Sequence, residues 1–244
     1  MTSINSSNTE LELSIVVPVH NEKEILESTV RGIVRELEFR SSDFEVILVE
    51  NGSTDNSGSI IEALSADDSR IVGLHLGKPS YGYALLTGLR SATGKIVGHF
   101  SVDIVDFEFF DNALDELKSV DLVLGSKLLD VNQDYRPFHK RIGSQVFHVL
   151  SRRFLGVPVV DSHCIKMMNR SVLKSILDRC SGGSQIFDDE LVLRASQEGV
   201  TMSEIPFRCE EIRSSRIGVL SRSIHALWQL TELRVTLWKE RFGK

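Results

Sequence analysis

The chain has 244 residues, of which 41% are hydrophobic and 25% are charged, and this fits one large globular domain with or without a C-terminal appendage. Its formal net charge of −6 argues against a nucleic acid as partner. The three cysteines, Cys164, Cys180 and Cys209, lie far apart in the sequence, so neither a disulfide framework nor a zinc site is predicted.

The first sixty residues predict a βαβ unit. Residues 1–12 are polar and lack the pattern of a signal peptide, so we expect a flexible N-terminus. The apolar, β-branched run 15–19 is typical of a strand covered on both faces, and apolar residues recur at helical spacing over 25–37. A second strand at 46–49 leads into the polar turn 50–55, which opens another helix. Open α/β sheets bind ligands at such loops.

The same alternation continues along the chain. Strands are predicted at 71–76, 96–101 and 122–125, and helices at 81–91, 111–118 and 143–155. Strands that alternate with helices indicate an α/β fold with a mostly parallel sheet flanked by helices. Residues 130–142 have the most loop-like composition in the interior of the chain, so we expect a loop over a site there.

Six segments carry a resemblance to a known family. They are VVPVHNE (16–22), LVENGSTDNS (48–57), SYGYALLTGLRSATGKIVGHFSVDI (80–104), LVLGSKLLD (122–130), VVDSHCIKMMNRSVL (159–173) and QIFDDELVLRASQEGVTMSEIPF (185–207). In this order they resemble the family 2 glycosyltransferases, a group with the Rossmann-like GT-A fold that includes polyprenyl-phosphate sugar synthases. The resemblance implies a GT-A domain over residues 13–212 that binds a nucleotide diphosphate sugar.

The resemblance also implies where the nucleotide lies. Pro18, His20, Glu22 and Glu50 fall at positions that line the base pocket of the family. Glu50 follows a predicted strand, where a carboxylate can accept hydrogen bonds from the base or ribose. The neighbouring residues 51–53 have a second interpretation as a tight turn and helix N-cap, since Asn and Ser favour both.

The sequence does not decide whether the protein binds a divalent cation. The family ends a strand in an Asp-x-Asp pair that holds Mg²⁺ or Mn²⁺ against the diphosphate, and hard oxygen ligands suit both ions. Here the pair is reduced to Ser101 and Asp103, and Val105 stands where some relatives have a further polar ligand. Asp106 is a candidate replacement. Because Asp103 alone is a poor magnesium site, the sequence leaves open whether a metal is needed.

Two basic residues are candidates for the diphosphate. Lys127 matches a family position where a basic residue faces the phosphates, and Arg141 falls where another family arginine often lies. Two cations would supply part of the electrostatic stabilisation that a missing metal ligand weakens. The alternative for both is a solvated side chain on a loop.

The acceptor side has its own carboxylates. Asp188, Asp189 and Glu190 open a predicted helix, where acidic residues are common for dipole reasons alone. The resemblance implies that Asp188, with Asp103, is catalytic, and that Asp161, on a predicted strand, lies on the acceptor side. Asp188 is the candidate general base if the acceptor is a hydroxyl. It would mainly orient groups if the acceptor is a lipid phosphate, which is already an anion.

The C-terminal tail differs in charge from the rest. Residues 213–244 carry seven basic and two acidic residues, a balance of +5, so the remaining chain carries −11. Residues 222–242 predict a basic amphipathic helix with Trp228 and Trp238 on one stripe. Such a helix suits a membrane interface. The alternative is a helix that packs on the domain or on a second subunit of a homo-oligomer.

The leading interpretation is an inverting glycosyltransferase that moves a hexose from a nucleotide-activated sugar to polyprenyl phosphate or a glycan. We expect it in the cytoplasm, peripheral at the inner face of the membrane, because no apolar run approaches the ~20 residues that span a bilayer. The alternative is a nucleotide-sugar-binding protein that has lost turnover, suggested by Ser101 and Val105. A dinucleotide-binding oxidoreductase is disfavoured, because no GxGxxG motif follows the first strand.

Overall fold

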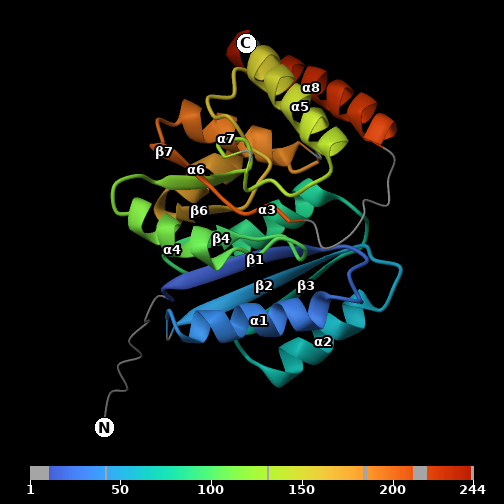
Figure 1. Cartoon of the computed structure of the whole chain (residues 1–244), viewed down its shortest axis with the longest axis vertical. Coiled ribbons are helices and arrows are strands. Elements are labelled where there is room, and N and C mark those ends of the chain that lie inside the picture. The colour runs from blue at the N-terminus through green and yellow to red at the C-terminus, as the bar shows by residue number, and fades with distance from the viewer. Residues whose placement is uncertain (1–10, 42, 131, 184–185, 211–218, 243–244) are drawn as a thin grey trace.

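The computed structural model describes residues 11–41, 43–130, 132–183, 186–210 and 219–242, and it has an α/β fold (Figure 1). The strands are β1 (Leu13–Val19), β2 (Phe44–Asn51), β3 (Ile71–Leu76), β4 (Ile96–His99), β5 (Leu122–Ser126), β6 (Lys166–Asn169) and β7 (Met202–Pro206). The helices are α1 (Leu26–Glu38), α2 (Ser57–Asp67), α3 (Tyr81–Ser91), α4 (Phe107–Glu116), α5 (Phe138–Leu155), α6 (Arg170–Arg179), α7 (Phe187–Gln197) and α8 (Val219–Phe242).

The strands form one seven-stranded sheet in the order β3-β2-β1-β4-β6-β5-β7. Every neighbouring pair is parallel except those of β6, which runs antiparallel to β4 and β5. The mostly parallel sheet predicted from the sequence is therefore confirmed. Because β2 and β4 lie on opposite sides of β1, the strand order reverses there, and a ligand is expected to bind between the loops that follow β1 and β4 at the carboxyl edge.

Two apolar cores cover the two faces of this sheet. Strand residues alternate between them, so that Val16 packs with α3, α6 and α7 whereas Ile15 packs with α1, α2 and α4. The strands β1 and β2 are buried almost throughout, as expected for central parallel strands with helices on both faces. Both cores bring the carboxyl ends of β1 to β4 to one rigid edge.

Several predicted element bounds were wrong, and the strand expected at 96–101, for example, ends at His99. The helix expected at 111–118 begins earlier, at Phe107, because Asp106 caps it and accepts hydrogen bonds from the backbone N–H groups of Glu108 and Phe109. The loop expected at 130–142 ends at Pro137, and α5 begins at Phe138. The first turns of α5 expose Phe138 and Ile142, so they lack the buried stripe by which a helix is recognised.

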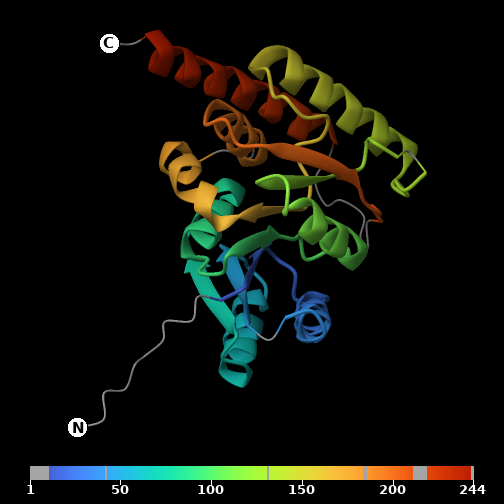
Figure 2. The ribbon, with the colours of Figure 1, turned by 90° about the vertical axis from the view of Figure 1, so that its left-hand side faces the viewer.

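The C-terminal helix α8 lies beside α5 (Figure 2). Its Leu230 and Leu233 are buried in the same core as α7, whereas Trp228 and Trp238 are exposed. Among the described helices, none is both long and apolar enough to cross a membrane. The expected flexible N-terminus up to residue 10 and the expected boundary at 212/213 lie outside the described residues, whereas Leu11 and Glu12 already accept backbone hydrogen bonds from the β4 edge.

Candidate active site

The loops after β1 and β2 are joined by hydrogen bonds at the carboxyl edge. His20 Nδ1 lies 2.7 Å from the Asn51 carbonyl oxygen, and the Asn21 side-chain oxygen accepts a 2.8 Å bond from the Thr54 N–H. The Glu22 N–H donates to Ser57 Oγ at 2.8 Å. These bonds bring His20 and Glu22 to the same edge as the end of β2, and Pro18 lies there because it pairs with Val49 in the sheet.

The Glu50 side chain is hydrogen bonded to the turn that follows β2. Its carboxylate accepts a short hydrogen bond from the Ser53 N–H, and its other oxygen lies 3.9 Å from His75 Nδ1. Gly52 adopts a φ of +62°, and a Cβ there would lie 2.7 Å from Pro79 Cδ, so both the backbone conformation and the available space require glycine. The turn predicted at 51–53 is present, and it holds Glu50 largely buried.

Ser101 and Asp103 lie just beyond β4 and are hydrogen bonded to each other. The Ser101 hydroxyl donates to Asp103 Oδ1, so one carboxylate and one hydroxyl stand where the family pattern has two carboxylates. In the part of the chain that the structure describes, no group of three or more His, Cys, Asp and Glu side chains is placed to hold a metal. Of the two positions of the reduced Asp-x-Asp pair, only Asp103 offers a carboxylate to a divalent cation.

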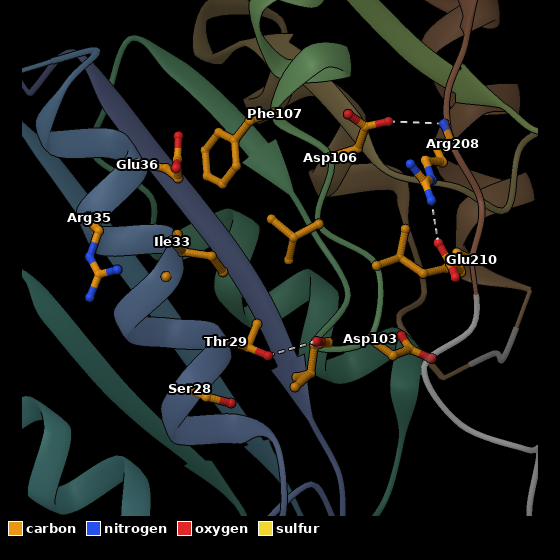
Figure 3. A pocket seen from close by; sticks show the side chains of 14 residues that line it. Ser28, Thr29, Ile33, Arg35, Glu36, Asp103, Asp106, Phe107, Arg208 and Glu210 are labelled. Atoms are coloured by element: carbon orange, nitrogen blue, oxygen red, sulfur yellow. Dashed lines mark hydrogen bonds and ion pairs between the residues drawn. The ribbon is translucent and has the colours of Figure 1, made fainter. Parts of the chain in front are cut away.

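Asp106 does not join Asp103. Its carboxylate caps α4 and also accepts a 3.0 Å bond from the Arg208 N–H. A cavity of about 500 Å³ is lined by α1 and by residues 102–107, and Figure 3 shows Asp103 and Asp106 at opposite ends of it, with Asp106 turned toward Arg208. Asp106 is thus held by three backbone donors, which explains its position by helix capping alone.

Asp188 lies buried at the start of α7, with both carboxylate oxygens engaged. Oδ1 forms a short ion pair with Lys166 Nζ, and Oδ2 accepts a 2.8 Å hydrogen bond from the Tyr81 hydroxyl. Burial alone would raise the pKa of Asp188, but the Lys166 ammonium outweighs it and holds the pKa at about 2. Burial and the Asp188 charge raise the pKa of the Tyr81 phenol, which therefore stays protonated. Asp188 is a fixed anion.

Asp161 forms a second buried ion pair. It was predicted on a strand, but it lies in the loop between α5 and β6, and Lys127 Nζ lies 2.8 Å from its Oδ2. His148 Nε2 lies 2.8 Å from its other oxygen. Burial would raise the pKa of Asp161, but Lys127 and then His148 hold it well below its usual range. Cys164, predicted in the core, is buried and also contacts the Lys127 ammonium at 2.8 Å.

Arg141 lies in the first turns of α5, with one third of its side chain exposed and its Nε 4.0 Å from Asp134 Oδ2. Arg136 binds the same carboxylate more closely, with two bonds of 2.8 Å, and its side chain is almost fully buried. The predicted cation Arg141 is therefore more open to a ligand than Lys127, whose ammonium is enclosed by Asp161, Cys164 and the His163 carbonyl.

Sequence reasoning missed Lys166, Tyr81 and His99. Burial, followed by the charge of Lys166, lowers the pKa of His99 to about 3, so the buried imidazole is neutral beside the edge of the Tyr81 ring. A signal for Lys166 was present, because a lysine among Ile165, Met167 and Met168 interrupts an apolar strand and so requires a buried partner. Nothing local identifies Tyr81, whose contact with Asp188 spans 107 positions of the sequence.

The comparisons with known proteins agree with this geometry. The family described as Glycosyl transferase family 2 matches residues 14–177, which is more than half of the chain. The chain is 29% identical over 238 residues to glycosyltransferase AglD of Haloferax volcanii, covering 91% of this chain but 38% of that protein. It is 25% identical to dolichyl-phosphate beta-glucosyltransferase ALG5D of Trichomonas vaginalis, covering 96% and 78%.

Solved structures show the same fold. The mannosyltransferase PcManGT of Pyrobaculum calidifontis, in complex with GDP-Man and Mn²⁺, has a TM-score of 0.64 at 20% identity, over 97% of this chain and 66% of that one. Glucosyl-3-phosphoglycerate synthase of Mycobacterium tuberculosis, in complex with Mn²⁺, UDP and phosphoglyceric acid, has a TM-score of 0.63 at 18% identity, over 96% and 79%. The chain therefore belongs to glycosyl transferase family 2 and has the GT-A fold.

Proposed function

We propose that this glycosyltransferase moves a hexose from a nucleotide diphosphate sugar to the phosphate of a polyprenyl-type lipid, with inversion at the anomeric carbon. The observation that carries the proposal is the state of Asp188, which is ionised but has both oxygens engaged by Lys166 and Tyr81. A hydroxyl acceptor needs a general base that is free to take its proton. A phosphate acceptor is already an anion and needs none.

In this reaction a phosphate oxygen of the lipid attacks the anomeric carbon, and the bond from that carbon to the nucleotide diphosphate breaks. The electron pair leaves with the diphosphate, and the single displacement inverts the anomeric centre. We propose that Asp188, through Tyr81 and Lys166, orients groups on the acceptor side. Lys127 and Asp161 would not touch the substrate but would act as positioning residues for the acceptor side, because their charges are paired with each other and buried.

We propose that the nucleotide lies across the loops after β1 and β2, against Pro18, His20, Glu22 and Glu50. The engaged Glu50 carboxylate and the bonded His20 ring support a preformed pocket. Asp103 and Arg141 would then face the diphosphate. If Mg²⁺ or Mn²⁺ is bound, Asp103 holds it, and the ion supplies charge stabilisation for the leaving diphosphate. Two structural neighbours were crystallised with Mn²⁺, which supports a divalent cation as cofactor but does not assign its ligands.

The names of two relatives support the substrate classes. ALG5D is a dolichyl-phosphate glucosyltransferase by name, and PcManGT was crystallised with GDP-Man. We also propose that the protein works in the cytoplasm, at the inner face of a membrane. The support is that Cys164, Cys180 and Cys209 are free thiols, which is usual in a reducing compartment.

A transfer assay tests the proposal. Purified protein is given UDP-glucose or GDP-mannose with a short-chain polyprenyl phosphate or the matching polyprenol, with and without MnCl₂, and products are identified by mass spectrometry. We expect transfer to the phosphate and none to the alcohol. Transfer to polyprenol, or only to a soluble sugar, would contradict the proposed acceptor. Nucleotide-sugar binding without any transfer would instead favour the binding protein suggested by Ser101.

Two variants connect the assay to the site. Asp103→Asn and Glu50→Ala should each lower kcat/KM by about 100-fold, the size typical for the loss of a group that stabilises transition-state charge or positions the substrate. Asp115→Asn, at an exposed carboxylate on α4, is the matched control and should leave kcat/KM unchanged. Thermal melting checks that each variant is folded. Unchanged kinetics in both site variants would remove the nucleotide from this edge of the sheet.

A further inference from the structure

The helices α5 and α8 lie side by side across the end of the molecule that is opposite α1 and α2 (Figures 1 and 2). The Arg234 guanidinium of α8 donates a short hydrogen bond to the Phe154 carbonyl oxygen of α5, which ties the two helices together. Each helix buries one face against the body and turns the opposite face outward. These outward faces expose large apolar side chains, which a surface in contact with water alone does not require.

On α5 the outward face carries four apolar side chains, each between 43% and 74% exposed. They are Phe138, Ile142, Val146 and Val149. At 100° per residue they fall within an arc of about 80°. The opposite side of the helix buries His148, Ser151 and Leu155. A stripe of this width is what a helix normally turns to a core, yet here it faces away from the protein.

On α8 the outward face carries Trp228, Val235 and Trp238, which are between 50% and 61% exposed. The opposite side buries Leu230 and Leu233 against the body. We call the seven exposed residues of the two helices the α5–α8 face. Seven exposed apolar side chains on two adjacent helices are more than the isolated ones that are normal on protein surfaces, and such a concentration is typical of an interaction site.

Basic residues dominate the charge of these two helices. The helix α5 has four Lys or Arg and no Asp or Glu, and α8 has four basic and two acidic residues. The two helices together therefore carry +6, and since the chain carries −6 the rest of the protein carries −12. Arg152, Arg153 and Lys239 are exposed. An exposed apolar face on helices with a positive net charge is complementary to a lipid bilayer that has anionic headgroups above an apolar interior.

We propose that the α5–α8 face docks the enzyme on an anionic lipid surface. Tryptophans favour the headgroup level of a bilayer, the apolar stripe of α5 enters the acyl boundary, and the flanking basic residues meet anionic headgroups. A second copy of the chain fits less well, because two such faces would bring their positive charges together. The inference rests on the proposed function only in giving the lipid acceptor a nearby membrane, and docking itself needs no substrate.

Vesicle co-sedimentation with the full chain tests the docking. The probe is vesicles of phosphatidylcholine, with or without phosphatidylglycerol, and without any polyprenyl phosphate, at low and high salt. We expect binding to the anionic vesicles at low salt, weakening as salt is added. Both tryptophans of the chain lie on α8, so their emission should shift to the blue on binding. An absence of binding to anionic vesicles at low salt would overturn the proposal.

Matched variants locate the contact. The double change Val146→Asp with Val149→Asp should weaken vesicle binding by about tenfold or more, since it places charge on the apolar stripe. Phe39→Asp, at an exposed apolar residue beyond the end of α1, is the control and should bind like the wild type. Undiminished binding by the double variant would refute this face.

Two further readouts separate the remaining outcomes. Light scattering after gel filtration reports the oligomeric state, and a dimer that the Val146→Asp and Val149→Asp changes dissociate would replace the lipid surface by a second copy. Transfer to a short-chain polyprenyl phosphate in detergent reports the proposed function without a bilayer. Docking that fails while this transfer continues overturns the inference alone, whereas docking without transfer overturns the proposed acceptor alone.

Discussion

At the carboxyl ends of β1 and β2 the polar contacts join backbone groups to short side chains, whereas at the start of α7 they join ionised side chains that are fully buried. His20 and Asn21 are exposed or half-buried and bonded to a neighbouring loop. Asp188 and Lys166 are enclosed by the core. The first region can adjust when a ligand binds at small cost, and the second cannot move without exposing or orphaning a charge. Substitutions in the two regions should therefore fail in different ways.

The largest expected effect is on stability, from Lys166→Met. This change leaves the Asp188 carboxylate buried and without its cation, which typically costs about 3–5 kcal/mol of unfolding free energy. Urea unfolding at neutral pH measures it. Lys118→Met, which removes an exposed ion pair with Asp115, is the control and should change the free energy by less than about 0.5 kcal/mol.

A second variant sharpens this test. Lys166→Met combined with Asp188→Asn removes both charges and should recover part of the lost stability, because the remaining amide is cheaper to bury than a carboxylate. If the single change costs less than about 1 kcal/mol, the pair is not a buried one, and the contrast between the two regions disappears.

An intermediate effect is expected from acid, through His99. The pKa of His99 is about 3 in the folded protein and about 6.5 when the ring is exposed, so the unfolded state binds one more proton between these values. Its contribution to stability is complete above pH 6.5 and is lost as the pH falls, by about 1.4 kcal/mol per pH unit. Urea unfolding from pH 7 to about 4.5 measures the slope and stays above the range in which Asp188, with a pKa of about 2, begins to contribute.

His99→Gln should flatten this slope, and His139→Gln, at an exposed histidine on α5, should not. Equal slopes for the wild type and His99→Gln would mean that His99 is protonated or solvated in the folded protein. Water would then reach the groups around Asp188, although their contacts indicate a buried site.

The smallest effect is expected on the nucleotide side, from Ser101→Asp. A second carboxylate beside Asp103 adds a hard ligand. The gain in nucleotide-sugar affinity on adding Mn²⁺ should therefore be about threefold to tenfold larger in the variant than in the wild type. Ser119→Asp, at an exposed serine after α4, controls for added charge. Isothermal titration with and without Mn²⁺ measures the difference. A wild-type protein that already saturates at low micromolar Mn²⁺ would show that a ligand other than Ser101 completes the site.

Local pattern explains which features could be predicted. The strand at 71–76 and the helix at 81–91 have the bounds expected from their apolar periodicity, because each buries one continuous run. The pairing of Asp188 with Lys166 and Tyr81 could not be predicted, since it depends on how α3, β6 and α7 meet in space. In the same way, Trp228 and Trp238 were placed on one stripe, but only tertiary packing on Leu230 and Leu233 decides that this stripe faces outward.

The helix α7 is buried nearly all round, and this has a consequence for its rotation about its own axis. A helix with one apolar stripe is oriented by that stripe, but α7 has no polar side to distinguish. Its first turn supplies the direction instead, because Asp188 binds Lys166, Asp189 accepts hydrogen bonds from Ser151 and Ser162, and Glu190 accepts them from Ser181. Successive residues point 100° apart, so these three carboxylates bind different segments of the protein around the helix. One residue inserted directly after Glu190 would rotate these three side chains by 100° relative to the rest of the buried helix, and all three carboxylates would lose their partners at once.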